Sequence, residues 1–143
     1  ERFEHVVAIE SSCYLDRPRW AASVAANLAP GGLVHIVDCF RAERVSLEWF
    51  DDYWRTRVGA LSEYQTALET AGLSAITVEN LAPRAWSFWD LSCAWIEQNG
   101  APGRIREAKL TAHRALQTAL RTGVLRYLRV TATKHVERSG GVS

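Results

Sequence analysis

The chain has 143 residues, of which 48% are hydrophobic, and its formal net charge at pH 7 is +1. This length fits a single domain with enough apolar side chains to bury a core. The near balance of acidic and basic residues gives no electrostatic case for nucleic acid or an anionic membrane as a partner. The sequence shows no apolar stretch near 20 residues and no signal-peptide pattern, so we expect a cytoplasmic protein.

The three cysteines, Cys13, Cys39 and Cys93, are scattered along the chain and odd in number. This pattern favours free thiols in a reducing compartment over a disulfide or zinc framework, and the histidines show no metal-ligand spacing, so no metal is expected. The sequence contains no methionine and opens almost directly on an apolar run, which suggests part of a longer protein or a chain whose start has been removed. Only two of its 17 basic residues are lysine, which hints at a bacterial source.

The stretch of residues 28–40, LAPGGLVHIVDCF, carries the clearest structural signal. Its first two residues are expected to close a helix, because Pro30 cannot continue one and the two glycines after it permit a sharp reversal. From Leu33 the run is apolar and β-branched, which is typical of a strand covered on both faces in a parallel sheet. Asp38 stands near the carboxyl end of this strand, where open α/β sheets place ligand-contacting residues.

The segment before that stretch predicts a second buried parallel strand over residues 5–10, ending in Glu10. Asp16 is positioned to cap a helix that begins near Arg17, and the two strands with this helix form a βαβ unit. The apolar stripe expected along the helix is Trp20, Val24 and Leu28.

The rest of the chain predicts an alternation of helices and strands. Ser46 is expected to cap a short aromatic helix, Gly72 to end the next helix, and Gly123 to end the last one. The expected helices are 61–71, 83–98 and 104–121, and the expected strands are 73–81 and 124–136, followed by a polar tail. The fold class is therefore α/β.

Three segments in this order resemble one enzyme family: AIESSCYLD at residues 8–16, LAPGGLVHIVD at 28–38, and the helix end from Glu63 to Leu73. The chain resembles the C-terminal half of class I S-adenosylmethionine-dependent methyltransferases, in particular the branch that methylates bacterial small-molecule natural products. The resemblance implies a Rossmann-like sheet of order 3-2-1-4-5-7-6, of which this chain supplies strands 4, 5, 7 and 6. Residues 1–136 would form this part of the domain, with lid-type helices at about 41–58 and 83–121 and a flexible tail at 137–143.

The family's cofactor signature, a glycine-rich loop after strand 1, has no counterpart in this sequence. Because the cofactor of such a sheet lies between strands 1 and 4, half of its site is expected to come from outside these residues. We therefore expect S-adenosylmethionine as the cofactor only when the missing half is present.

The resemblance assigns roles to the loop that follows the first strand. Glu10, Ser11 and Ser12 would contact the cofactor, although the serines also suit an ordinary turn. Relatives often carry a histidine base near the position of Tyr14, and tyrosine is a poorer base near neutral pH, so Tyr14 is expected to position the acceptor. The candidate catalytic residues are Glu10, Tyr14 and Asp38, and a base could also come from the missing half.

The aromatic residues of the two helical inserts allow two interpretations, core packing or a lid over a hydrophobic acceptor. The lid interpretation names Trp49, Trp54, Trp86 and Trp89 as substrate-binding residues, together with Tyr14. Arg84, Arg104 and Arg106 are expected to be solvated.

Two functional hypotheses follow. The chain is part of a methyltransferase completed by a missing N-terminal half, or it is a non-catalytic binding or assembly module, or a methyltransferase-derived cyclase. In either case the strand at residues 5–9 would have an open edge, which invites pairing. We therefore expect a homodimer, or a partner chain that covers this edge, besides a small-molecule acceptor.

Overall fold

The computed structural model describes residues 2–135 and contains one four-stranded sheet. Its strands are β1 (Phe3–Ile9), β2 (Leu28–Arg41), β3 (Leu73–Asn80) and β4 (Leu125–Lys134), in the order β1-β2-β4-β3. β1 runs parallel to β2, and β4 lies antiparallel between β2 and β3. This arrangement is the one expected for strands 4, 5, 7 and 6, so the predicted fold class is confirmed. The predicted tail at 137–143 lies outside the described residues.

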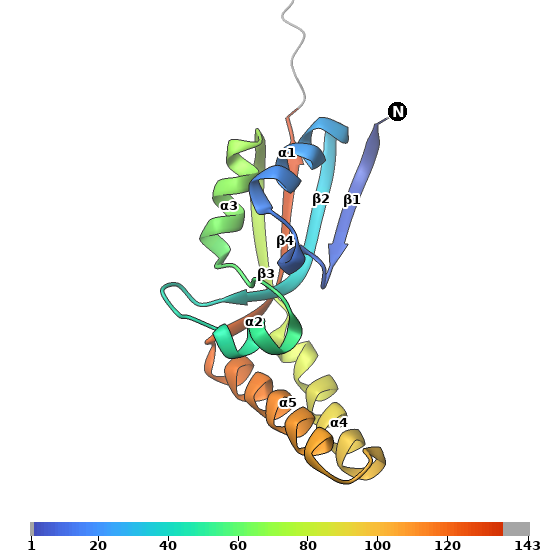
Figure 1. The fold of residues 1–143 in the computed structure, drawn as a ribbon. Helices are drawn as coiled ribbons and strands as arrows, with labels where there is room; N and C mark the ends of the chain where they lie inside the picture. Colours follow the sequence, from blue (N-terminus) through green and yellow to red (C-terminus); the bar gives the residue numbers. More distant parts are fainter. Residues whose placement is uncertain (1, 136–143) are drawn as a thin grey trace, which may run out of the picture.

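The helices form two groups, one on the sheet and one beyond its end (Figure 1). α1 (Arg17–Asn27) and α3 (Leu61–Thr70) pack side by side over one face of the sheet. α4 (Ala82–Asn99) and α5 (Arg104–Thr122) form a hairpin that extends below the sheet, and α2 (Glu48–Trp54) lies between the sheet and this hairpin. A short 3-10 turn, η1 (Ser12–Tyr14), follows β1.

Most of the predicted helix ends are found where the sequence places them. The carboxylate of Asp16 accepts a hydrogen bond from the Arg19 backbone N–H and so caps α1. Gly72 and Gly123 follow α3 and α5 with positive φ angles of 81° and 74°. The predicted Ser46 cap is wrong, because α2 begins one residue later, with Leu47 at its N-cap and no side-chain capping bond.

The Pro30-Gly-Gly segment also differs from its prediction. α1 ends at Asn27, and Leu28 already pairs with Phe3 of β1, so this segment lies within β2 and not between helix and strand. The register shifts between Phe3 and His5, and residues 29–32 form a bulge on β2. Gly32 suits this bulge, because a Cβ atom there would lie 2.9 Å from the Ala29 carbonyl oxygen.

The hydrophobic core lies between the sheet and the α1–α3 layer. Val34, Ile36 and Phe40 point to this face of β2 and have no exposed surface. The ring of Phe40 meets that of Tyr64 edge to face at 4.7 Å between centroids. A second cluster joins α2 and α5 to the end of the sheet, with Leu47, Phe50, Leu116 and Leu125 among its members.

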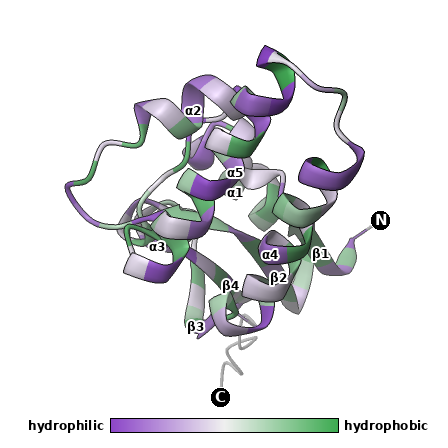
Figure 2. Cartoon of the chain, turned by 90° about the horizontal axis from the view of Figure 1, so that it is seen from below, coloured by the Kyte–Doolittle hydropathy of each residue, from purple (hydrophilic) through white to green (hydrophobic). Residues whose placement is uncertain are grey.

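The opposite face of the sheet is largely open. Seen from below, α1 and α3 lie on one side of the strands (Figure 2). On the other side the alternate residues Phe3, Val7 and Ile9 of β1 are 54%, 58% and 61% exposed. The expectation of a strand buried on both faces is therefore wrong for β1 in this chain, because residues 2–135 supply a helical layer to one face only.

Candidate functional site

The loop after β1 is shaped by a strained residue. Glu10 has a φ angle of 47°, in the left-handed region, and its backbone N–H donates to the carbonyl of Val37 at 2.8 Å. The chain then turns directly into η1, so Ser12 and Cys13 come to lie against the end of β2. This turn brings the carboxyl ends of the two parallel strands together.

Asp38 anchors this loop and is itself almost fully buried. Its Oδ2 accepts hydrogen bonds from the Ser12 backbone N–H at 2.9 Å, the Ser12 hydroxyl at 2.6 Å and the Cys13 N–H at 3.2 Å. Its Oδ1 accepts the Cys39 N–H at 2.8 Å. Four donors satisfy a charge that would be costly to bury alone. The carboxylate could act as a base only if some of these bonds broke, so the geometry favours a positioning role for Asp38 over the predicted catalytic one.

Glu10 is held differently, because its side chain remains exposed. Its Oε1 accepts a hydrogen bond from the Tyr127 hydroxyl at 2.9 Å. Burial, followed by the hydrogen bond to Glu10, raises the pKa of Tyr127 well above its ordinary value, so this phenol stays protonated and donates at neutral pH. Glu10 is therefore an oriented carboxylate with lone pairs left for another partner.

A cavity of about 190 Å³ opens at this point, bounded by the loop, the end of β2, α2 and the hairpin. The three predicted catalytic residues line it, as do two of the predicted substrate-binding tryptophans. Its lining includes Glu10, Tyr14, Asp38, Trp54 and Trp89. The indole rings of Trp54 and Trp89 stand 6.5 Å apart between centroids, at an interplanar angle of 71°. The structure thus brings carboxylate, phenol and aromatic side chains to one hollow.

Tyr14 lines this cavity with a half-exposed ring. Burial, together with the nearby Cys13, Asp38 and Glu10 side chains, raises the pKa of its phenol. Tyr14 is therefore protonated near neutral pH and can donate a hydrogen bond to a ligand.

The remaining predicted site residues lie elsewhere. Ser12 is 1% exposed, and its hydroxyl forms hydrogen bonds with Asp38 and Tyr64. Ser11 and Glu10 are therefore the residues of this loop that a cofactor could contact. Trp49 faces the opposite side of α2 and lines a shallow groove against α5. Trp86 is 39% exposed, and it is not among the residues that line the described cavity.

The cysteines of the site are free but unreactive in character. Burial, followed by the charge of Asp38, raises the pKa of the Cys13 thiol to about 12, and the same two causes raise the pKa of Cys39 further. Neither thiol is a thiolate near neutral pH, so the site does not offer a cysteine nucleophile.

Sequence reasoning missed two side chains that shape this region. Tyr127 falls within the predicted strand 124–136, and nothing in the sequence predicts that its hydroxyl binds Glu10, which lies 117 residues away. His113 was set aside for lack of metal spacing, yet its ring lies 5.6 Å from Trp54 and 5.7 Å from Trp89. No local pattern announces either contact, because both depend on how α5 and β4 return to the site.

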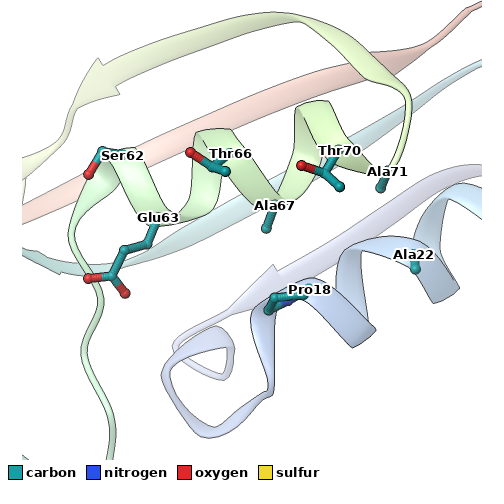
Figure 3. A pocket seen from close by; sticks show the side chains of 8 residues that line it. All are labelled: Pro18, Ala22, Ser62, Glu63, Thr66, Ala67, Thr70 and Ala71. Carbon is teal, nitrogen blue, oxygen red and sulfur yellow. The ribbon is translucent and has the colours of Figure 1, made fainter.

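One further hollow offers less chemistry. A cavity of about 410 Å³ between α1 and α3 is lined by small side chains from both helices, such as Ala22 and Ala67 (Figure 3). Its one charged residue, Glu63, is engaged by Arg17 and Arg41. Within residues 2–135 no cluster of three or more histidine, cysteine or acidic side chains could hold a metal ion, and no helix there has the length and apolar composition to cross a membrane.

No protein-family model and no curated protein sequence matches this chain. Solved structures do match. Phosphoethanolamine N-methyltransferase 2 of Haemonchus contortus, in complex with phosphomonomethylethanolamine and S-adenosylhomocysteine, is 17% identical with a TM-score of 0.76, covering 93% of this chain and 34% of that one. A cyclopropane synthase of Mycobacterium tuberculosis is 12% identical with a TM-score of 0.80, covering 94% of this chain and 56% of that one.

A third match is the geranyl diphosphate C-methyltransferase of Streptomyces coelicolor, in complex with Mg²⁺, geranyl diphosphate and S-adenosylhomocysteine. It is 17% identical with a TM-score of 0.70, covering 92% of this chain and 48% of that one. The chain thus spans between about a third and just over half of the length of these three structures. At such low identity the likeness concerns the fold, and this chain has the fold of part of a methyltransferase of the S-adenosylmethionine-dependent kind.

Proposed function

We propose that this chain is the acceptor-side part of an S-adenosylmethionine-dependent methyltransferase that acts on a small organic molecule. The observation that carries the proposal is the hollow at the carboxyl ends of β1 and β2, where Glu10, Tyr14, Trp54 and Trp89 converge. Open α/β sheets bind their ligands at this edge. The matching structures include enzymes solved with S-adenosylhomocysteine, which supports this cofactor.

In this proposal each side chain has a separate task. Glu10 takes the proton from the acceptor, and Tyr127 keeps the carboxylate turned toward it. Tyr14 donates a hydrogen bond, the two indoles hold the apolar body of the acceptor, and Asp38 fixes the loop. The lid is formed by α2 with the α4–α5 hairpin.

The cofactor supplies an activated methyl group when it is bound. Glu10 and Ser11 are accessible at the end of β1 and fit a polar ligand there, whereas Ser12 is committed to Asp38. The proposal keeps the expectation that the glycine-rich half of the cofactor site lies outside these residues. We also propose a bacterial, cytoplasmic enzyme of natural-product metabolism, and leave the acceptor at the level of an apolar molecule with a nucleophilic oxygen, nitrogen or carbon atom.

A second function is favoured by one observation. The cavity beside Glu10 is formed entirely by this chain, so it could hold an apolar ligand without any cofactor half. This describes a non-catalytic binding or assembly module, or a methyltransferase-derived cyclase.

Intact mass spectrometry and light scattering of the natural protein, followed by calorimetry with S-adenosylmethionine, separate the two functions. A longer or paired species that binds the cofactor supports the methyltransferase, whereas a self-contained 16 kDa species or its homodimer without binding heat supports the module.

In the natural protein, Glu10→Gln should lower kcat by about 100-fold, because a positioned base contributes on this order. Glu4→Gln, which removes an exposed carboxylate from the same strand, is the matched control and should leave kcat unchanged. If the Glu10→Gln enzyme keeps its kcat, Glu10 is not the base, and the base would then come from the half of the site that these residues do not contain.

A further inference from the structure

A second and larger cavity, of about 570 Å³, lies along the α4–α5 hairpin and the end of α2. Its walls combine aromatic and aliphatic side chains with positive charge. The apolar members include Tyr53, Trp54, Trp95, Ile96 and Ile105. Trp95 is 64% and Ile105 is 76% exposed. The apolar walls are therefore accessible to a ligand from solvent.

Three cations line the same cavity: Arg104, Arg106 and Lys109. No carboxylate lines it, and among the described residues these three take part in none of the ion pairs, which use other arginines. The acids on the neighbouring turns of α4 are engaged elsewhere, Glu97 by Arg114 and Asp90 by Arg121. The cavity lining therefore carries three positive charges and no negative one, which attracts anions; Glu107, the acid in the first turn of α5, does not line it.

The first turn of α5 adds to this charge. Gly103 at its N-cap has no side chain to accept the backbone N–H groups that follow, so these donors stay free of a side-chain cap. Such groups, with the positive end of a 19-residue helix, favour an anion next to Arg104 and Arg106. The helix end supports the site that the cavity and its cations define.

The inner wall offers polar groups without adding charge. The Trp54 indole lines both this cavity and the one beside Glu10, and its Nε1–H is buried without a hydrogen-bond partner among the described residues. His113 Nδ1 lies 2.8 Å from the Ser92 hydroxyl, and burial, followed by the charge of Lys109, lowers its pKa, so the ring is neutral near pH 7. The positive charge of the cavity thus comes from the arginines and the lysine.

We propose that this cavity binds an amphipathic anion, with an aromatic or aliphatic body against Trp54, Trp95 and Ile105 and a phosphate or carboxylate at Arg104, Arg106 and Lys109. Arg104 is exposed and Arg106 partly exposed, which agrees with the expectation that both are solvated, and the fold of the hairpin places both at one apolar hollow. The site goes beyond the proposed methyl transfer, since it is built from different residues except for Trp54, which lines both cavities.

Calorimetry on the natural protein, without S-adenosylmethionine, tests this site directly. The probes are 1-naphthyl phosphate, 1-naphthoate, 1-naphthol and inorganic phosphate. We expect 1-naphthyl phosphate to bind most tightly and 1-naphthoate next, with each of the other two at least about tenfold weaker than the phosphate ester, since each lacks one half of the recognition. Equal binding of 1-naphthol and 1-naphthyl phosphate would overturn the proposal.

Substitutions then locate the site. Arg104→Ala, Arg106→Ala and Lys109→Ala should each weaken 1-naphthyl phosphate by about tenfold, and Trp95→Ala by a similar factor. Arg126→Ala removes an exposed arginine of β4 that does not line the cavity and should change nothing. These side chains lie at the surface or partly exposed, so folding is retained, which circular dichroism can verify.

The triple cation variant gives the decisive result. If it binds 1-naphthyl phosphate as the unaltered protein does, the anion is held elsewhere and the proposal is wrong. If the Trp89→Ala variant loses binding and Trp95→Ala does not, the probe occupies the cavity beside Glu10 and the proposal is equally wrong. Methyl transfer enters none of these measurements, so the proposed function can fail while this site stands, or the reverse.

Discussion

The parallel strands β1 and β2 carry apolar side chains on both faces of the sheet, but the two faces meet different surroundings. On one face the alternate residues of β2 have no exposed surface under α1 and α3. On the other face the apolar side chains of β1 are more than half exposed. Strands of near-continuous apolar composition belong to sheets covered on both faces. We infer from this contrast that the open face of β1 suits a second layer, which residues 2–135 do not provide.

The same contrast appears in the two carboxylates of the candidate site. Asp38 lies on the covered side and accepts four hydrogen bonds, whereas the exposed carboxylate of Glu10 accepts one, from Tyr127. A buried charge needs complete satisfaction, and an exposed one keeps lone pairs for a ligand. Asp38, on the covered face, therefore stabilises the loop, whereas Glu10, on the open side, is available to bind a ligand.

The largest expected effect tests the comparison of the faces directly. In the 143-residue chain, Ile36→Ala should lower the free energy of unfolding by about 2–5 kcal/mol, because it leaves a cavity under the helices. Ile9→Ala, the same substitution on the open face, should cost about 1 kcal/mol or less, because the side chain is already 61% exposed. Urea denaturation measures both values.

The stability change caused by Ile9→Ala can also be measured in the natural protein. If another segment or partner covers β1 there, the cost of this substitution should rise toward that of Ile36→Ala. If Ile9→Ala and Ile36→Ala lower the free energy of unfolding equally in the 143-residue chain, the idea that this face of β1 is open is contradicted.

The second effect concerns the two carboxylates. Asp38→Asn should destabilise the chain by about 2–3 kcal/mol, since an amide nitrogen would face backbone donors and leave some of them unpaired in the interior. Glu10→Gln should change stability by no more than about 0.5 kcal/mol, as expected for an exposed position. Thermal and urea unfolding of the two variants give the comparison, and a stability loss that is larger for Glu10→Gln would reverse the roles assigned to them.

Part of the fold could be predicted from the sequence. The order of the sheet, the Asp16 cap and the glycines after α3 and α5 follow from local patterns and from the resemblance, and the structure has them. Exposure of Val7 and Ile9 could not be foreseen, because an apolar strand composition predicts burial on both faces, whereas residues 2–135 place helices over one face only.

Helical phase explains part of what was missed in the site. Trp49 and Trp54 are five residues apart, which separates them by about 140° around a helix, so they cannot face one hollow. Only Trp54 reaches the cavity beside Glu10, and Trp49 lies against α5. Long-range partners such as Tyr127 for Glu10 depend on the register of β4 against β2, which no local pattern contains.

A third effect concerns association through the open face and edge. At concentrations of about 100 µM the 143-residue chain should form dimers or larger species, because exposed apolar strands with a free edge pair with one another. Val7→Lys combined with Ile9→Lys should shift this equilibrium toward the monomer. Ser23→Lys combined with Ala26→Lys, which adds the same two charges at exposed positions of α1, should not. Light scattering after gel filtration measures the species. A monodisperse monomer of the unaltered chain would remove the case for a partner at this edge.

The smallest effect isolates the one hydrogen bond that holds Glu10. Tyr127→Phe should lower the free energy of unfolding at pH 8 by about 1 kcal/mol or less, the usual contribution of a partly exposed hydrogen bond.

Because folding raises the pKa of Tyr127, the contribution of this residue to stability is present below the pKa of the unfolded phenol, near 10, and is lost as the pH rises above it. Urea unfolding at pH 8 and pH 10.5 should therefore show a larger loss of stability in the unaltered chain than in Tyr127→Phe. Tyr53→Phe, which removes another phenol from α2, should leave that loss unchanged. If Tyr127→Phe and Tyr53→Phe both lose as much stability between pH 8 and pH 10.5 as the unaltered chain does, the hydrogen bond from Tyr127 does not hold Glu10. The Glu10 carboxylate would then be as mobile as that of any surface acid.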